Sequence, residues 1–183
     1  LMERLACRET DINHNKLKNP AKMNAKDNQN LDLFFDVFEP TVKDYLKVID
    51  GVSKVSEIKK HIEYYKPEAV VIDQLTQLDE NRKFGSIREQ FSYMTRTLKS
   101  LTKSMDIPII LLCQISRSGE NKPPTFSDLK ESGSIEEDSD NIIALHQTAD
   151  VKGECTPTDI MILKQRNGKR DICIPCMYQN EKF

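Results

Sequence analysis

The sequence predicts an α/β protein with a mostly parallel sheet flanked by helices and a β-hairpin near its C-terminal end. Two short apolar runs, residues 69–72 and 107–112, are typical of strands that are covered on both faces. Residues 86–105 lie between them and have the clearest helical pattern in the chain, so strand, helix and strand form a βαβ unit with parallel strands. Asn167-Gly168, between two later apolar segments, is the strongest short signal for a hairpin.

The N-terminal third of the chain has weaker patterns. Residues 1–9 are helical in pattern without a capping residue ahead of them, so we expect the sequence to begin inside a larger protein. Residues 10–30 are mostly polar and predict a long connection with one short helix. Residues 31–38 are largely apolar and predict a strand, whereas residues 39–53 fit no single pattern.

Helices are predicted at residues 54–65 and 86–105, where apolar residues recur at spacings of three and four. The second helix carries one continuous apolar stripe, made by Ile87, Phe91, Met94, Leu98, Leu101 and Met105. Further strands are predicted at residues 141–145, 159–166 and 169–174.

Composition places the chain among globular proteins. Its 183 residues are enough for one domain, with 31% charged and 38% apolar residues. The net charge of −2 does not mark the whole surface as nucleic-acid-binding, so any such binding must come from local basic loops. There is no run long enough to cross a membrane. Five irregularly spaced cysteines do not resemble a disulfide framework, which favours a reducing compartment, the cytoplasm.

Polar residues follow both strands of the βαβ unit. Asp73 ends the first strand and Gln114 ends the second, so both lie at the edge where open α/β sheets hold their ligands. A carboxylate there suits the magnesium of a nucleotide, and an amide can hydrogen-bond a phosphate oxygen or a water. The alternatives are a solvated acid and an amide that satisfies a loop backbone.

Two basic segments are candidates for binding anions. Lys164 and Arg166 point to the same face of a strand near the hairpin tip, although two solvated charges are the simpler interpretation. The polar stretch at 116–140 is long for a loop in a compact domain, which indicates a functional or disordered segment. Its small residues and cations, including Arg117 and Lys130, suit a phosphate chain, and an ordinary surface loop is the alternative.

Other site types find little support. His146, Cys155, Cys173 and Cys176 contain a single close cysteine pair, on opposite faces of one predicted strand, which disfavours structural zinc. Cys113 lies within a predicted strand and suits packing. The phosphate-binding pattern G-x-x-x-x-G-K-[ST] does not occur in these residues, and there is no Ser–His–Asp or Cys–His constellation.

Taken together, the sequence resembles the C-terminal motor domain of DnaB-type replicative helicases, a RecA-like ATPase family. The resemblance runs from about residue 1 to residue 177, with a divergent stretch at 10–60. Four blocks carry it in the family's order: Val70-Val71-Ile72-Asp73-Gln74-Leu75-Thr76-Gln77-Leu78, Ile109-Ile110-Leu111-Leu112-Cys113-Gln114-Ile115-Ser116-Arg117, Ser127-Asp128-Leu129-Lys130-Glu131-Ser132-Gly133-Ser134-Ile135-Glu136-Glu137-Asp138, and Lys164-Gln165-Arg166-Asn167-Gly168.

The resemblance implies a nucleotide site for ATP and Mg²⁺ that is shared between subunits of a homo-hexameric ring. Asp73 would be the Walker B acid that orders magnesium through its waters, and Gln114 the sensor of the γ-phosphate. Lys164 and Arg166 would act in trans on the neighbouring subunit's nucleotide, with Arg166 as an arginine finger.

The implied partner is single-stranded DNA, with primase or a helicase loader as further partners. The residues implied to contact the strand are Arg117, Lys130, Glu131 and Gly133. Lys130 stands where many members have arginine, which keeps the charge but loses the bidentate fork.

Two departures qualify these expectations. The family's phosphate loop and catalytic glutamate precede the region that this chain matches, so residues 1–183 alone are not expected to hydrolyse ATP. Residues 36–54 also differ from the family's shorter acidic turn. The main hypothesis is therefore one RecA-like ATPase domain over residues 1–183, N-terminally incomplete, from a DNA helicase. The alternative is a non-enzymatic binding module of the same fold, and a recombinase-like ATPase is disfavoured by the 164–168 block.

Overall fold

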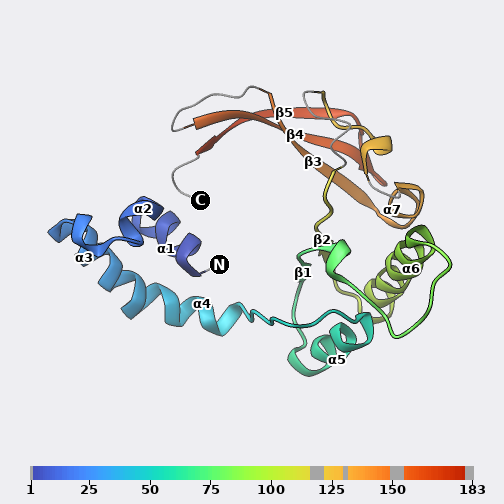
Figure 1. Ribbon diagram of the computed structural model, residues 1–183, viewed down its shortest axis with the longest axis horizontal. Helices are drawn as coiled ribbons and strands as arrows, with labels where there is room; N and C mark the ends of the chain where they lie inside the picture. Colours follow the sequence, from blue (N-terminus) through green and yellow to red (C-terminus); the bar gives the residue numbers. More distant parts are fainter. Residues whose placement is uncertain (1, 116–121, 130–131, 149–154, 180–183) are drawn as a thin grey trace. The chain divides into compact units, whose positions relative to one another are not determined.

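The computed structural model describes residues 2–115, 122–129, 132–148 and 155–179 (Figure 1). These residues divide into two compact units. One unit consists of the described residues of Leu1–Ile49, Gln147–Thr158 and Pro175–Phe183, and the other of those in Asp50–His146 and Asp159–Ile174. The second unit contains the predicted βαβ arrangement and most of the candidate site.

The first 45 residues are helical almost throughout. The predicted N-terminal helix is confirmed as α1 (Met2–Thr10), in which Ala6 and Cys7 are buried. Residues 10–30 contain more helix than the one short segment predicted. The elements that follow α1 are α2 (His14–Leu17), a 3₁₀ turn (Pro20–Lys22), α3 (Ala25–Leu33), a π-helical turn (Phe34–Phe38) and α4 (Glu39–Tyr45).

The strand predicted at residues 31–38 is wrong, because this segment continues a helix that begins at Ala25. Asn24 caps the helix: its side chain accepts a hydrogen bond from the Asp27 amide at 2.8 Å, and the Asp27 carboxylate accepts from the Asn24 amide at 3.0 Å. The helical period then brings the rings of Phe34 and Phe38 into contact, with centroids 5.3 Å apart and planes tilted by 30°. A short apolar run does not by itself distinguish strand from helix, and here the cap upstream decides.

The βαβ unit is confirmed in the second unit. Helix α5 (Val55–Tyr65) precedes strand β1 (Val70–Ile72), and helix α6 (Ile87–Met105) connects β1 to strand β2 (Ile109–Leu111). The strands are parallel, with Val70, Val71 and Ile72 opposite Ile109, Ile110 and Leu111. Ser86 caps α6, since its hydroxyl accepts a hydrogen bond from the Glu89 amide at 3.1 Å.

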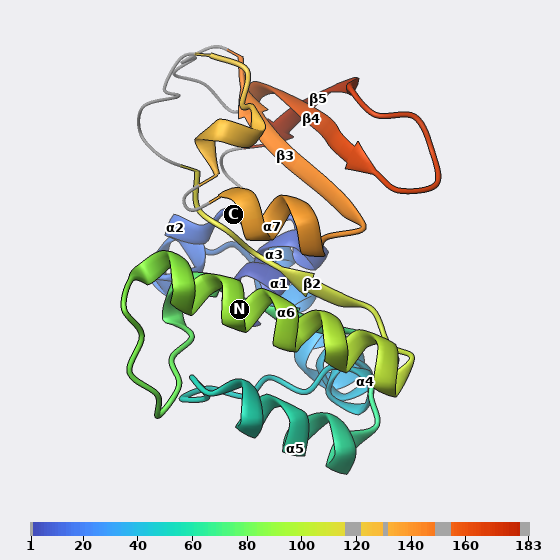
Figure 2. The same ribbon diagram turned by 90° about the vertical axis from the view of Figure 1, so that its right-hand side faces the viewer.

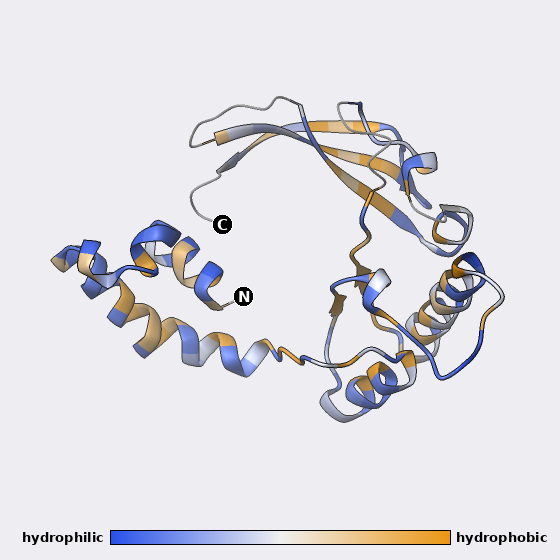
Figure 3. Cartoon of the chain, viewed as in Figure 1, coloured by the Kyte–Doolittle hydropathy of each residue, from blue (hydrophilic) through white to orange (hydrophobic). Residues whose placement is uncertain are grey.

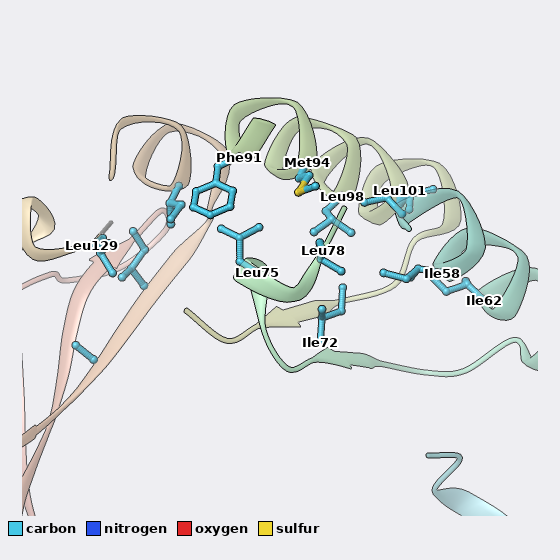
Figure 4. Packing of buried hydrophobic residues seen from close by; sticks show 14 of the residues in the cluster. Ile58, Ile62, Ile72, Leu75, Leu78, Phe91, Met94, Leu98, Leu101 and Leu129 are labelled. Carbon is cyan, nitrogen blue, oxygen red and sulfur yellow. The ribbon is translucent and has the colours of Figure 1, made fainter. Parts of the chain in front are cut away.

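The hydrophobic core lies where α5 and α6 cover one face of these two strands (Figure 4). Phe91, Met94, Leu98 and Leu101 of α6 point toward Ile72, Leu75 and Leu78, and α5 contributes Ile58 and Ile62. The predicted stripe on α6 therefore faces the core, except that Ile87 at the first turn is 64% exposed.

The opposite face of the two strands is open, although both strands are hydrophobic along their length (Figure 3). Val71 is 63% exposed and Ile110 is 54% exposed, because alternate residues of a strand point to opposite faces. The prediction that both faces are covered is thus wrong for the described residues, where one face packs on helices and the other does not.

The C-terminal part forms a three-stranded sheet in the order β3-β4-β5. Its strands are β3 (Asn141–Gln147), β4 (Cys155–Gln165) and β5 (Ile172–Gln179). The Arg166 amide donates to the Asp140 carbonyl, and the Thr148 amide donates to the Pro157 carbonyl, so β3 and β4 run antiparallel. The predicted hairpin is confirmed, because β4 and β5 are joined by residues 166–171, which include Asn167-Gly168.

Helix α7 (Ser132–Asp138) precedes β3 and packs on α6 (Figure 2). Thr95 of α6 donates from its hydroxyl to the Asp138 carboxylate at 2.6 Å and so fixes the end of α7. Among the helices that the structure describes, none is long and apolar enough to cross a membrane.

Candidate functional site

Asp73 and Gln114 follow the carboxyl ends of two neighbouring parallel strands. The Leu112 amide donates to the Ile72 carbonyl at 3.0 Å, and the Leu75 amide donates to the Leu112 carbonyl at 2.9 Å, so the pairing continues past both strands. The side chains of Asp73 and Gln114 are exposed at this edge. Neither has a hydrogen-bond partner within the described part of the chain, which leaves the carboxylate and the amide open to a ligand.

The backbone at this edge is closely fixed on either side of these two residues. Leu75, two residues after Asp73, is buried in the core. Ile115, which follows Gln114, pairs as an antiparallel bridge with Leu129. The bridge therefore ties the residue after Gln114 to Leu129, which is buried in the core.

Lys164 and Arg166 both contact residues 136–140, where α7 ends and β3 begins. We call this segment the junction. Lys164 donates from its Nζ to the carbonyl oxygens of Glu136 and Ser139, the second at 2.8 Å. Arg166 donates from Nη1 to the Asp140 Oδ1 at 2.7 Å. The two cations thus share a face, as the spacing predicts, but they are not simply solvated, because both already contact this junction.

Asp140 is the anion at the centre of this junction. Its Oδ2 accepts from the Lys99 Nζ of α6, and its Oδ1 accepts from Arg166. These two hydrogen bonds, that of Lys99 first, lower the pKa of Asp140 below its ordinary value, because both favour the ionised carboxylate. Asp140 is therefore held as a carboxylate between two cations from different elements.

The sequence did not point to Asp140 or Lys99. They lie 41 residues apart, so no local spacing connects them, and Asp140 follows a run of acids that has the pattern of an ordinary solvated surface. The one available signal is that Asp140 directly precedes the predicted strand at 141–145. That strand pairs with the strand that leads to Arg166, but the pairing is not evident from spacing.

The predicted nucleic-acid residues are only partly described. Arg117, Lys130 and Glu131 lie outside the described residues. Gly133 is in the first turn of α7, where an added Cβ would lie 3.4 Å from the Arg88 Nη2 of α6. A guanidinium group that the sequence did not single out thus lies beside this glycine.

The cysteines and histidines do not assemble around a common point. Among the described residues there is no group of three or more His, Cys, Asp or Glu side chains that could hold a metal ion. Cys176 donates from its thiol to the Thr158 carbonyl at 2.9 Å, and burial raises the pKa of the Cys113 thiol. Cys113 packs against the core, as predicted for a strand cysteine.

Comparison with known proteins identifies the family. The protein-family model described as "DnaB-like helicase C terminal domain" matches residues 1–182 of this chain. The chain belongs to this family. A solved structure, described as that of a DnaB-like replicative helicase and its interactions with primase, has a TM-score of 0.81 at 23% identity and covers 98% of this chain and 45% of that chain. That likeness supports the RecA-like α/β fold.

Curated relatives of this DnaB-like chain are named replicative DNA helicase DnaB. The protein of Treponema pallidum (strain Nichols) is 35% identical over 103 residues, which are 56% of this chain and 23% of that protein. The protein of Geobacillus stearothermophilus is 35% identical over 126 residues, which are 63% of this chain and 28% of that protein. The chain thus spans about a quarter of the length of these relatives.

Proposed function

We propose that this chain is part of the motor of an ATP-dependent replicative DNA helicase that moves along single-stranded DNA as a homo-hexameric ring. The family match over residues 1–182 is the observation that carries the proposal. Residues 1–183 would form one RecA-like ATPase domain, with primase or a helicase loader as further partners. Five unpaired cysteines in the structure suit the reducing cytoplasm.

The nucleotide site in this proposal begins at the edge marked by Asp73 and Gln114. Magnesium in nucleotide sites is held by one or two carboxylates together with waters and substrate phosphates, so the single exposed carboxylate of Asp73 fits that donor set. Asp73 would orient the waters around the ion, which neutralises charge on the phosphates. The Gln114 amide would hydrogen-bond the γ-phosphate and transmit its loss to the loop that starts at the next residues.

Lys164 and Arg166 would complete the neighbouring subunit's site. No hydrogen bond or ion pair among the described residues joins these two cations to Asp73 or Gln114, which is compatible with action on another subunit's nucleotide. Arg166 is 64% exposed and carries five N–H donors, of which one is used by Asp140. Its other donors are available to phosphate oxygens.

The nucleic-acid contacts would come from Arg117, Lys130, Glu131 and Gly133. Gly133 belongs to the first turn of α7, and the end of that helix receives Lys164. One short helix therefore connects the DNA-binding segment to the cations of the nucleotide site.

The test is hydrolysis and unwinding by the full-length protein. We expect ATPase activity that single-stranded DNA stimulates, unwinding of a forked duplex, and loss of both in Asp73→Asn. Asp79→Asn is the matched control, since that exposed carboxylate accepts from the Glu80 amide and does not end a strand. Absence of ATPase and unwinding in the wild type, with DNA present, would instead support a non-enzymatic binding module, which the lack of G-x-x-x-x-G-K-[ST] in these 183 residues also fits.

A further inference from the structure

We infer that Asp140 is a positioning residue for Arg166, which it aims at the neighbouring subunit's nucleotide while Lys99 fixes Asp140 in place. The inference rests on the proposed function, because it assigns Arg166 the trans-acting role. Its structural basis is a chain of three side chains from three elements: Lys99 on α6, Asp140 between α7 and β3, and Arg166 at the end of β4.

The contacts tie Arg166 to Asp140 through both backbone and side chain. The Arg166 amide donates to the Asp140 carbonyl at 2.9 Å, and Nη1 donates to Oδ1 at 2.7 Å. The backbone and the guanidinium group of Arg166 are thus both hydrogen-bonded to Asp140. A long side chain held at two points has already lost much of its rotamer freedom, so less entropy is lost when it binds phosphate.

The carboxylate has a separate partner for each oxygen. Oδ2 accepts from Lys99, whereas Oδ1 accepts from Arg166. Because Lys99 and Arg166 bind different oxygens, Asp140 keeps a compensating cation if Arg166 shifts toward a ligand. The single Nη1 contact leaves four N–H donors of the guanidinium for phosphate oxygens.

The two cations that contact Asp140 differ in how far their side chains are exposed. The Lys99 side chain is 18% exposed, whereas Arg166 is 64% exposed and Asp140 48%. Lys99 is therefore the anchor and Arg166 the accessible end. An exposed ion pair of this kind contributes little to stability, about 0–1 kcal/mol, so its chief consequence is the direction in which the guanidinium points.

The experiment measures ATP hydrolysis by the full-length protein carrying Asp140→Asn. If Asp140 acts on the transition state through Arg166, kcat should fall about tenfold while KM changes less than about twofold. Asp79→Asn is the control, because the exposed Asp79 carboxylate accepts from the Glu80 amide and does not contact Arg166. That variant should keep kcat within about twofold of the wild type.

A double-mutant cycle separates positioning from a general structural role. Under single-turnover conditions, Asp140→Asn should cause less than about a twofold further loss in an Arg166→Ala background, since the residue through which it acts is absent. Equal losses in both backgrounds, or an unchanged kcat in Asp140→Asn, would overturn the inference. Failure of the proposed function is distinguishable, because Arg166→Ala itself would then leave hydrolysis intact or the wild type would show none.

Discussion

Lys164 caps the C-terminal end of α7, with its Nζ 2.8 Å from the carbonyl oxygen of Ser139. The last carbonyl groups of a helix have no partner within the helix and carry partial negative charge, so a lysine ammonium there stabilises the helix end. The same ammonium also donates to the Glu136 carbonyl. A cation predicted to act on another subunit thus has a structural role within its own chain.

Lys164→Met should loosen α7. Loss of the two hydrogen bonds should destabilise the helix by about 1 kcal/mol, which is less than for fully buried charge-assisted bonds because the lysine is partly exposed. Hydrogen exchange of the amides in residues 132–138 should become roughly fivefold faster. Lys169→Met, at an exposed position beyond the hairpin turn, is the matched control, and equal exchange rates in the two variants would contradict the capping role.

The core of the second unit was predictable because its signals are local and long. The residues of α6 from Phe91 to Leu101 repeat at helical spacing over three turns, and no competing pattern exists. Strands β1 and β2 were recognisable because each lies in a short apolar run that leads to a polar residue, Asp73 or Gln114. Their parallel pairing follows from the helix that connects them, because two strands joined by a helical crossover run in the same direction.

Other features depend on interactions between distant residues, so sequence patterns did not reveal them. The helix at Phe34–Phe38 depends on the Asn24 cap ten residues upstream. The link between Lys99 and Asp140 depends on how α7 packs on α6. The spacing of Lys164 and Arg166 places the two cations on one face of the hairpin, but spacing does not show which anions they contact.

Leu98→Ala should strongly destabilise the second unit. Leu98 is 4% exposed and lies among Met94, Leu101 and residues of β1, so truncation leaves a cavity that the tightly packed core cannot fill. The expected loss is about 2–5 kcal/mol in the free energy of unfolding, measured by urea denaturation.

The control on the same helix is Ile87→Ala, whose side chain is exposed in the first turn. It should change the free energy of unfolding by no more than about 0.5 kcal/mol. A similar loss in both variants would contradict the role of the buried stripe, because alanine is the best helix former and neither substitution lowers helix propensity.

Arg166→Ala should abolish hydrolysis and leave nucleotide binding largely intact. A trans-acting arginine stabilises charge that develops in the transition state, so kcat should fall by about 10³-fold or more. Nucleotide affinity should be measured in parallel with a fluorescent ATP analogue, because an effect confined to binding would argue against an arginine finger. Arg170→Ala, at an exposed position on the same hairpin, should retain activity.

Lys130→Ala should weaken the affinity of the full-length protein for single-stranded DNA. Lys130 itself lies outside the described residues, between Leu129, which is buried in the core, and Ser132, where α7 begins. One phosphate contact on a single strand contributes about 0.7 to the slope of log affinity against log salt concentration, so the slope should decrease in magnitude by that amount.

The salt dependence separates a DNA contact from an indirect effect of Lys130. Affinity should be measured by fluorescence anisotropy with labelled oligothymidine over a range of salt concentrations. Lys103→Ala, at an exposed position near the end of α6, is the control and should keep the wild-type slope. If Lys130→Ala lowers affinity equally at every salt concentration, it acts indirectly and not as a phosphate contact, because removing an ionic contact must change the number of counterions released.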